Sequence, residues 1–244
     1  MKKTSIAFLW QKFVDRIGED LMHFIFPRYC IVCGGRMHRG GKVFCLQCAA
    51  NFPYTHMQAK EGNDVEQLFW GLLPIERAHC FMYHYSHSPF SEIVYSLKYK
   101  NMPWVGVEMG RMMAQELLNE TNFFSGIDYI VPIPLHPRRL KSRGYNQCDC
   151  LIEGIYQVTK IPKRDDVLVR KRHNPTQTKL SRGERINNSE ALFACPIPED
   201  LTGKHILLVD DVLTTGSTIV ACGDAMRLVR GLKVSILVLA RAVD

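Results

Sequence analysis

The segment from His205 to Ile219, HILLVDDVLTTGSTI, combines residue types that suit a phosphorylated sugar. An apolar, strand-like run ends in two acids, Asp210 and Asp211, and the pattern predicts a helix from about Ser217. Ligands of open α/β sheets bind beyond the carboxyl ends of strands, where carboxylates can accept hydrogen bonds from vicinal hydroxyls. The loop between the acids and the helix offers hydroxyls and backbone N–H groups at the positive end of that helix, which suits a phosphate. Its candidate phosphate-binding residues are Leu213, Thr214, Thr215, Gly216, Ser217 and Thr218.

The same segment fits several well-known loop types less well. A nucleotide-hydrolase P-loop requires a lysine that this loop lacks, and a dinucleotide fingerprint requires a G-x-G-x-x-G spacing that is absent. A receiver domain can carry paired aspartates, but the chain after Asp211 has room for one helix and one strand only. The two acids could also simply cap the following helix. The hydroxyl-rich loop favours the phosphate site over a plain cap.

Positive charge is concentrated in one part of the chain. The formal net charge is +7, and the window from His136 to Arg185 holds 13 Lys and Arg against 5 Asp and Glu. We expect an anionic ligand to meet this window, although a solvated surface or a nucleic-acid backbone would also explain it.

Four of the nine cysteines have the spacing of a metal site. Cys30-x2-Cys33 and Cys45-x2-Cys48 form two knuckles that could converge on one tetrahedral ion, with Gly34 and Gly35 allowing a turn around sulfur. Zinc in a structural role is the interpretation, because protein thiolates fill all four positions. Iron, free thiols and a disulfide pair remain alternatives. The other five cysteines are expected to be small core or surface residues.

Composition indicates a globular protein. The chain has 244 residues, of which 46% are hydrophobic and 23% charged, so intrinsic disorder and collagen-like structure are excluded. No apolar run approaches the length of a membrane-spanning helix, and the signal-peptide-like start is interrupted by Gln11, Lys12, Asp15 and Arg16. We therefore expect a cytoplasmic protein without stable membrane insertion.

Hydrophobic periodicity predicts strands that alternate with helices, which indicates an α/β fold with a mainly parallel sheet. Strands are expected at Cys80–Tyr85, Asp128–Pro132, Val167–Arg170, Ala191–Phe193, His205–Val209 and Lys233–Leu239. Helices are expected at Phe90–Tyr99, Trp104–Leu118, Tyr145–Val158 and Ser217–Val229, with a Pro- and Arg-rich loop before the third.

The chain is expected to comprise four parts. They are an amphipathic helix at 1–26, the four-cysteine zinc module at 27–52, a connector at 53–78 and the α/β domain at 79–244. The first helix has one apolar stripe and could pack on the domain, on a membrane surface or on a partner.

The strand, the two acids and the loop resemble the phosphoribosyl-pyrophosphate (PRPP) motif of type I phosphoribosyltransferases, matched by Leu207–Thr218. Further segments are similar to one branch of that superfamily, the ComF (competence protein F) family. They are VPIPLHPRRLKSRGYNQ (Val131–Gln147), NPTQTKLSRGERINN (Asn174–Asn188), LVLAR near the end and the four-cysteine module. The resemblance implies a type I phosphoribosyltransferase-like fold with a small zinc-ribbon-like module before it.

The resemblance also implies roles for the basic residues. The loop after the first core strand would hold pyrophosphate, and its candidates are His136, Arg138, Arg139, Lys141 and Arg143. The stretch Arg170–Arg185 corresponds to a flexible loop that closes over the site and excludes water. Its candidate contacts are Gln177, Thr178, Ser181, Arg182 and Arg185.

Two functions follow from the resemblance. In the first, the protein is a transferase of the glycosyltransferase class: Asp210 and Asp211 orient the ribose of PRPP, Mg²⁺ bridges pyrophosphate and ribose hydroxyls, and an unidentified acceptor displaces pyrophosphate at C1. No general base is assigned. In the second, the protein is a non-catalytic accessory of DNA uptake that binds single-stranded DNA or uptake proteins. The sequence leaves the oligomeric state open.

Overall fold

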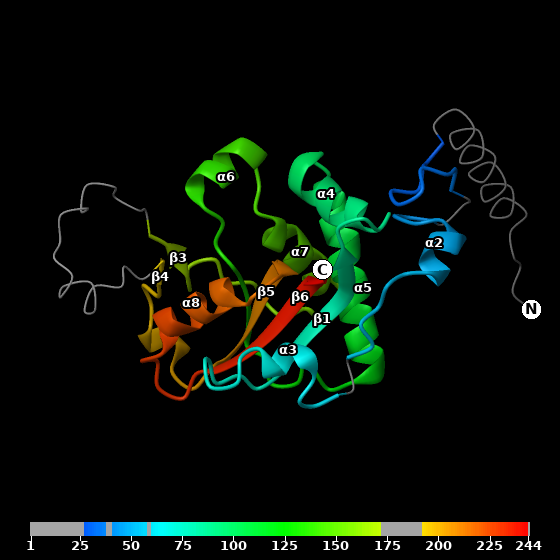
Figure 1. The fold of residues 1–244 in the computed structure, drawn as a ribbon. Coiled ribbons are helices and arrows are strands. Elements are labelled where there is room, and N and C mark those ends of the chain that lie inside the picture. The colour runs from blue at the N-terminus through cyan, green and yellow to red at the C-terminus, as the bar shows by residue number, and fades with distance from the viewer. Residues whose placement is uncertain (1–26, 38–40, 58–59, 172–191, 244) are drawn as a thin grey trace, which may run out of the picture. The chain divides into compact units, whose positions relative to one another are not determined.

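A computed structural model describes residues 27–37, 41–57, 60–171 and 192–243 (Figure 1). The chain divides into two compact units, Met1–Phe52 and Pro53–Asp244. The amphipathic helix expected at 1–26 lies outside the described residues, and so do the five candidate contacts of the flexible loop. In the described part, no helix has the length and apolar character needed to cross a membrane.

The described part of the first unit is small and built around its cysteines. Tyr29 pairs with Arg36 in an antiparallel bridge, and α2 spans Leu46–Ala50. Between Tyr29 and Arg36 the chain turns at Gly34, whose φ of 68° lies in the left-handed region that favours glycine. The N–H of Gly34 donates to the carbonyl of Cys30 over 2.9 Å, which closes the turn around the first knuckle.

The second unit is organised by a four-stranded sheet in the order β1-β6-β5-β2, in which every neighbouring pair is parallel (Figure 1). Its strands are β1 (Ala78–Tyr85), β2 (Tyr129–Pro132), β5 (His205–Leu213) and β6 (Lys233–Val243). The apolar runs of β5 and β6 are buried because helices cover both faces of a parallel sheet. The structure thus confirms the α/β class and the mainly parallel sheet.

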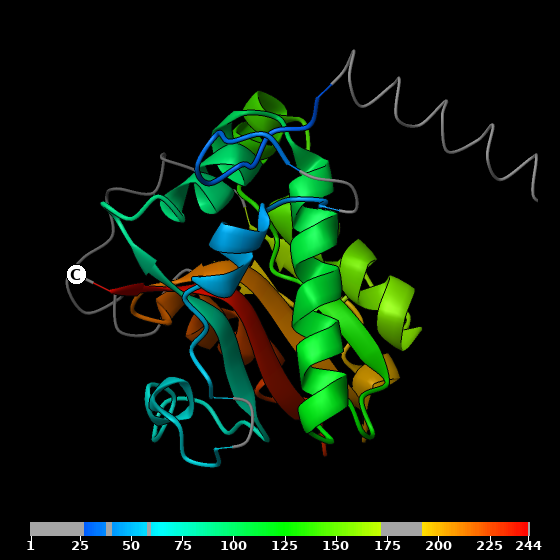
Figure 2. The same ribbon diagram turned by 90° about the vertical axis from the view of Figure 1, so that its right-hand side faces the viewer.

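Helices lie on both faces of this sheet (Figures 1 and 2). On one face are α4 (Ser91–Tyr99), α5 (Pro103–Glu120) and α7 (Gln147–Thr159), and on the other are α3 (Asp64–Gln67) and α8 (Ser217–Met226). Short elements connect them: α6 (Pro137–Arg143), η2 (Glu199–Leu201), and an antiparallel ribbon of β3 (Val169–Arg170) and β4 (Phe193–Ala194).

Several segments differ from their sequence-based expectation. The strand expected to end at Val209 continues to Leu213, because β6 also continues and pairs Asp210 with Val238 and Leu213 with Arg241. The Pro- and Arg-rich loop contains a helix, α6, whose Pro137 takes the first helical position, where its missing N–H costs no intrahelical bond. Residues 53–78, expected as a connector, include α3 and place Val65 and Phe69 in the core of the second unit.

Candidate functional site

A cavity of about 540 Å³ lies at the carboxyl ends of β2 and β5. The charged residues that line it come from α4, α6, β3 and β5, and Thr218 lines it from the first turn of α8. The helix α7, which follows β2 and α6, covers one face of the sheet, and α8, which follows β5, covers the other (Figure 1). This is a position where open α/β sheets bind ligands. Its charged lining residues are Lys98, Arg139, Arg143, Arg170, Asp210 and Asp211.

The two acids are held differently. A carboxylate oxygen of Asp210 accepts the backbone N–H of Asp211 over 2.8 Å, and the Cys148 thiol lies 3.8 Å from the same oxygen. Burial and the neighbouring Asp211 raise the pKa of Asp210 to about 7. Asp211 forms an ion pair with Lys98, with 3.1 Å between its Oδ1 and the lysine Nζ. One carboxylate thus faces a fixed cation, while the other can exchange a proton near neutral pH.

The predicted phosphate loop follows directly from β5. Gly216 caps α8 with a φ of 76°, and a Cβ at this position would lie 3.0 Å from the ring of Phe69. The backbone N–H of Ser217 donates to the Thr215 hydroxyl over 3.4 Å, which orients the entry to the helix. Thr218 lines the cavity, whereas Leu213 is buried in the core. Of the six predicted loop residues, the cavity lining includes Thr218 alone, and Thr214, Thr215, Gly216 and Ser217 lie outside it.

The predicted pyrophosphate residues lie on or beside α6. Arg139 and Arg143 line the cavity, whereas His136, Arg138 and Lys141 do not. His136 instead caps α6, since its ring Nδ1 accepts the backbone N–H of Arg138 over 3.2 Å. The Arg143 guanidinium lies 5.8 Å from the centre of the Tyr99 ring. One side of the helix therefore presents two guanidinium groups to the cavity.

Several lining residues were not predicted as site residues. Lys98 and Tyr99 end α4, Asn146 and Gln147 begin α7, and Arg170 ends β3. Asn146 has a recognisable signal, because it caps α7 by accepting the N–H of Cys148, and its amide also donates to the carbonyl of Ile133. The sequence carries no such signal for Lys98, which reaches the site only through tertiary packing.

The four predicted metal ligands come together in the first unit. The sulfur atoms of Cys30, Cys33, Cys45 and Cys48 all lie within 4.8 Å of one another. None of the nine cysteines is in a disulfide, so the disulfide alternative is wrong. Hydrogen bonds from backbone and thiol groups lower the pKa of Cys30 to about 7 despite its burial, which favours the thiolate. A set of four sulfur donors is typical of a structural zinc site.

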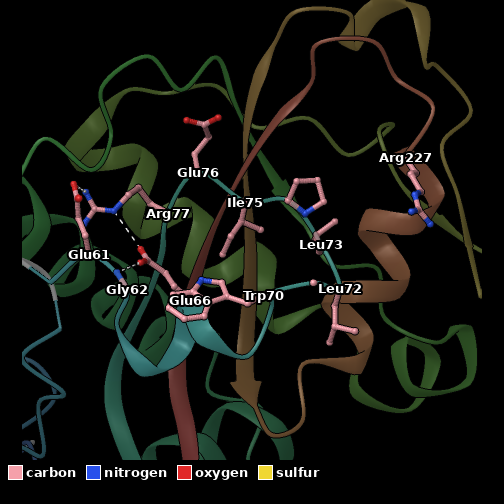
Figure 3. Close-up of a pocket in the computed structure, with 12 residues that line it drawn as sticks. Glu61, Gly62, Glu66, Trp70, Leu72, Leu73, Ile75, Glu76, Arg77 and Arg227 are labelled. Atoms are coloured by element: carbon pink, nitrogen blue, oxygen red, sulfur yellow. Dashed lines mark hydrogen bonds and ion pairs between the residues drawn. The ribbon is translucent and has the colours of Figure 1, made fainter.

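A second cavity of about 700 Å³ lies at the opposite end of the sheet, next to the start of β1 (Figure 3). Trp70 and Leu72 are exposed beside it. Its Arg77 is turned toward two acids, with 3.2 Å to Glu66 and 3.9 Å to Glu61 (Figure 3). Glu66 also accepts the backbone N–H groups of Gly62 and Ala78. These charged groups bind one another and fix the loop before β1, so we place the chemistry in the first cavity.

Comparisons with known proteins show which family the chain resembles. The family described as "Phosphoribosyl transferase domain" matches residues 148–243, which include the acids and the loop after them. Competence protein F of Haemophilus influenzae is 28% identical over 230 residues, covering 91% of this chain and 100% of that protein. The DNA utilization protein YhgH of Escherichia coli K12 is 30% identical over 192 residues, covering 78% of this chain and 80% of that protein.

Among solved structures, one match is glutamine phosphoribosylpyrophosphate amidotransferase from Bacillus subtilis. It is 19% identical with a TM-score of 0.37, and the match covers 54% of this chain and 25% of that one. The fold assignment depends on the sequence matches and on the sheet topology described above.

Proposed function

Because the chain belongs to the family of competence protein F and the DNA utilization protein YhgH, with a phosphoribosyltransferase domain, we propose that it binds PRPP together with Mg²⁺ in the cavity at the ends of β2 and β5. One observation carries the proposal: the same cavity contains the acid pair, a hydroxyl at the N-terminus of α8 and the two arginines of α6. These are the groups that a ribose with phosphates at both ends requires.

Each group has a defined part in binding. Asp210 and Asp211 accept hydrogen bonds from the ribose hydroxyls, and the loop before α8 holds the 5′-phosphate at the positive end of the helix. Arg139 and Arg143 face the pyrophosphate and can contact its oxygens in a bidentate manner. Mg²⁺ prefers oxygen ligands and supplies charge neutralisation for the pyrophosphate, whose own oxygens would hold it.

The proposed reaction is transfer of the phosphoribosyl group to an acceptor with release of pyrophosphate. The bond between ribose C1 and the pyrophosphate oxygen breaks, and a bond from C1 to the acceptor forms. Positive charge on Arg139 and Arg143 stabilises the negative charge that develops on the leaving pyrophosphate. The acceptor is unassigned. The family resemblance implies that the stretch Arg170–Arg185 closes over the bound sugar, and this remains a proposal because residues 172–185 lie outside the described residues.

A second function is favoured by the rim of the cavity. The rings of Tyr95 and Tyr99 are 5.1 Å apart, both rings are exposed, and Arg143 stacks on Tyr99. Exposed aromatic rings beside cations suit the bases and phosphates of a single strand of DNA. Under this second proposal, the protein is an accessory of DNA uptake, and the cavity recognises a phosphorylated end.

In the first unit, we propose that the four cysteines hold one structural zinc ion. A reducing, cytoplasmic compartment is part of this proposal, since it keeps the four thiols available to the metal.

The first experiment is calorimetric titration of PRPP with and without Mg²⁺. We expect binding that depends on Mg²⁺, and a loss of about 100-fold or more in affinity for Asp210→Asn with Asp211→Asn, because two charge-assisted hydrogen-bond acceptors are weakened. The matched control is Asp165→Asn with Asp166→Asn, an adjacent acid pair outside the cavity. No PRPP binding by the wild-type protein would reject the first proposal.

The second experiment measures binding of a 5′-phosphorylated single strand at several salt concentrations. Under the DNA proposal, affinity falls as salt rises, because phosphate contacts release counterions, and Tyr95→Ala with Tyr99→Ala weakens binding. An affinity that changes neither with salt concentration nor in the Tyr95→Ala, Tyr99→Ala variant would count against that surface.

A further inference from the structure

A lysine ammonium group lies beside the acid pair, and this lysine belongs to none of the motifs found in the sequence. Lys98, on the last turn of α4, places its Nζ 3.1 Å from Asp211 Oδ1 inside the cavity. The side chains of Lys98 and Asp211 are 21% and 13% exposed, so solvent screens this pair less than a surface ion pair.

The position of Lys98 is fixed by its neighbours on α4. Leu97 is fully buried, and its carbonyl accepts the Tyr145 hydroxyl over 2.5 Å, which ties the end of α4 to the segment between α6 and α7. Leu97 also faces Gly106 of α5, where a Cβ would lie 3.0 Å from the leucine side chain. The ammonium is therefore held at the acids by packing of its helix.

Three arginines, Arg139 and Arg143 of α6 and Arg170 of β3, line the same cavity as the acids. The remaining titratable groups around the acids are thiols and a histidine. The Cys148 thiol of α7 lies beside Asp210, and burial together with the nearby acids raises its pKa. Cys222 of α8 also interacts with Asp210, and burial raises the pKa of its thiol. His84 of β1 is close enough to Lys98 for the lysine charge to help lower the pKa of that imidazole. Among the groups that act on Asp210, Lys98 is the one whose positive charge favours ionisation of the carboxyl.

We infer that Lys98 is the positioning residue of the acid pair: its ammonium orients Asp211 and offsets the repulsion between two adjacent acids and an anionic sugar phosphate. The inference depends on the proposed function for its ligand, although the charge relation between Lys98 and the acids exists without one.

Removal of this cation has two consequences. The acid pair becomes harder to ionise, because two neighbouring carboxylates lose their nearest opposite charge. The pair also repels the negative charge of PRPP more strongly. Both effects weaken ligand binding at neutral pH, and the first shifts the pH at which binding appears to a higher value, since the hydrogen-bond acceptors for ribose are the ionised carboxylates.

The test compares Lys98→Met and Lys98→Arg in the full chain. We expect Lys98→Met to weaken Mg²⁺-dependent PRPP binding by about 10-fold or more at pH 7, as loss of a partly buried ion-pair partner predicts. The pH midpoint of binding should move upward, and Lys98→Arg should restore both properties to within a few-fold. The matched control is Lys204→Met. Lys204 directly precedes β5, at the end of that strand opposite the acids, and its Nζ forms a similar ion pair 3.2 Å from Asp128 Oδ1.

A second measurement needs no ligand. Carbon-13 NMR titration of the side-chain carboxyl groups follows the acid pair directly, and Lys98→Met should raise its apparent pKa values relative to both the wild type and Lys204→Met. If the carboxyl pKa values of Lys98→Met equal those of the wild type, the inference is overturned, regardless of the result for PRPP binding. If the apparent pKa values of the acid pair are raised in Lys98→Met but the wild type does not bind PRPP, the role of Lys98 is supported and the proposed ligand is rejected.

Discussion

At the scale of single residues, burial decides which charged state each group can adopt. Asp210 and Asp211 are adjacent in sequence, yet the first lies beside the buried Cys148 thiol and the second faces Lys98. The sequence assigned them one shared role, and the structure gives them different environments. A buried histidine, His79 on β1, shows the same effect of burial. It is 1% exposed, and neither ring nitrogen has a hydrogen-bond partner within the described residues.

His79 should make the protein less stable in mild acid. Burial, with a contribution from Arg77, lowers the pKa of His79 to about 4, whereas an unfolded chain has a value near 6.5. Between these values the unfolded state binds more protons, so this contribution is present above about pH 6.5 and is lost as pH falls toward 4. Over that range the free energy of unfolding should fall by up to about 3 kcal/mol through this group.

Urea unfolding at several pH values measures this dependence. We expect His79→Leu to flatten the pH dependence of the free energy of unfolding between about pH 6.5 and 4 relative to the wild type. The comparison variant is His56→Leu, at a histidine exposed on the surface. Equal slopes in all three proteins would show that His79 is not the group responsible.

At the scale of elements, the site depends on helices that approach each other closely. The backbones of α5 and α7 meet at glycines: a Cβ on Gly110 would lie 1.9 Å from the carbonyl oxygen of Leu151, and one on Gly154 would lie 2.0 Å from that of Val107. A side chain there would force the two helices apart. Since α7 carries Asn146 at its cap and Gln147 at its start, this contact sets the position of one cavity wall.

Gly154→Ala should therefore destabilise the fold by about 3 kcal/mol, because overpacking against backbone cannot be relieved by a side-chain rotation. The comparison is Gly126→Ala, at a position with φ of 75° and open space where the new methyl group would lie, so that only the left-handed conformation is penalised, by about 1 kcal/mol. Denaturant midpoints of the two variants give the difference. Similar midpoints would mean that α5 and α7 can separate at little cost.

At the scale of the whole molecule, the two units depend on different sources of stability. The sheet unit has an extended apolar core between helices, whereas the described part of the first unit buries few apolar side chains beside its cysteines: Met37, Val43, Phe44 and Phe52. A unit with so small a core usually requires a metal or disulfides to fold, and these cysteines form no disulfide.

Metal removal should therefore affect the first unit and leave the ligand binding of the second unit intact. We expect one equivalent of zinc per chain, and we expect chelation or Cys33→Ser with Cys45→Ser to unfold the first unit while PRPP binding by the second persists. Metal analysis, NMR spectra and calorimetry would be compared with Cys195→Ser, which changes a cysteine outside the cluster. Retention of the first unit's spectrum after complete metal loss would contradict a structural metal.

The sequence by itself determined the features that depend on local order. The alternation of strands and helices predicted the parallel α/β sheet, and the spacing of Cys30, Cys33, Cys45 and Cys48 predicted their convergence. The strand, the acids and the loop indicated the candidate site. These patterns are readable because strand period, knuckle turns and helix starts depend on residues close together in the chain.

Tertiary structure alone decided what surrounds the acids. It extended β5 through Asp210 and Asp211 by pairing with β6, formed α6 so that Arg139 and Arg143 face the cavity, and brought Lys98 from α4 to Asp211. Lys98 lies far from the acids in sequence and has no motif of its own. Its contact arises from the packing of α4 at the ends of the strands, a long-range arrangement that no local pattern of residues encodes.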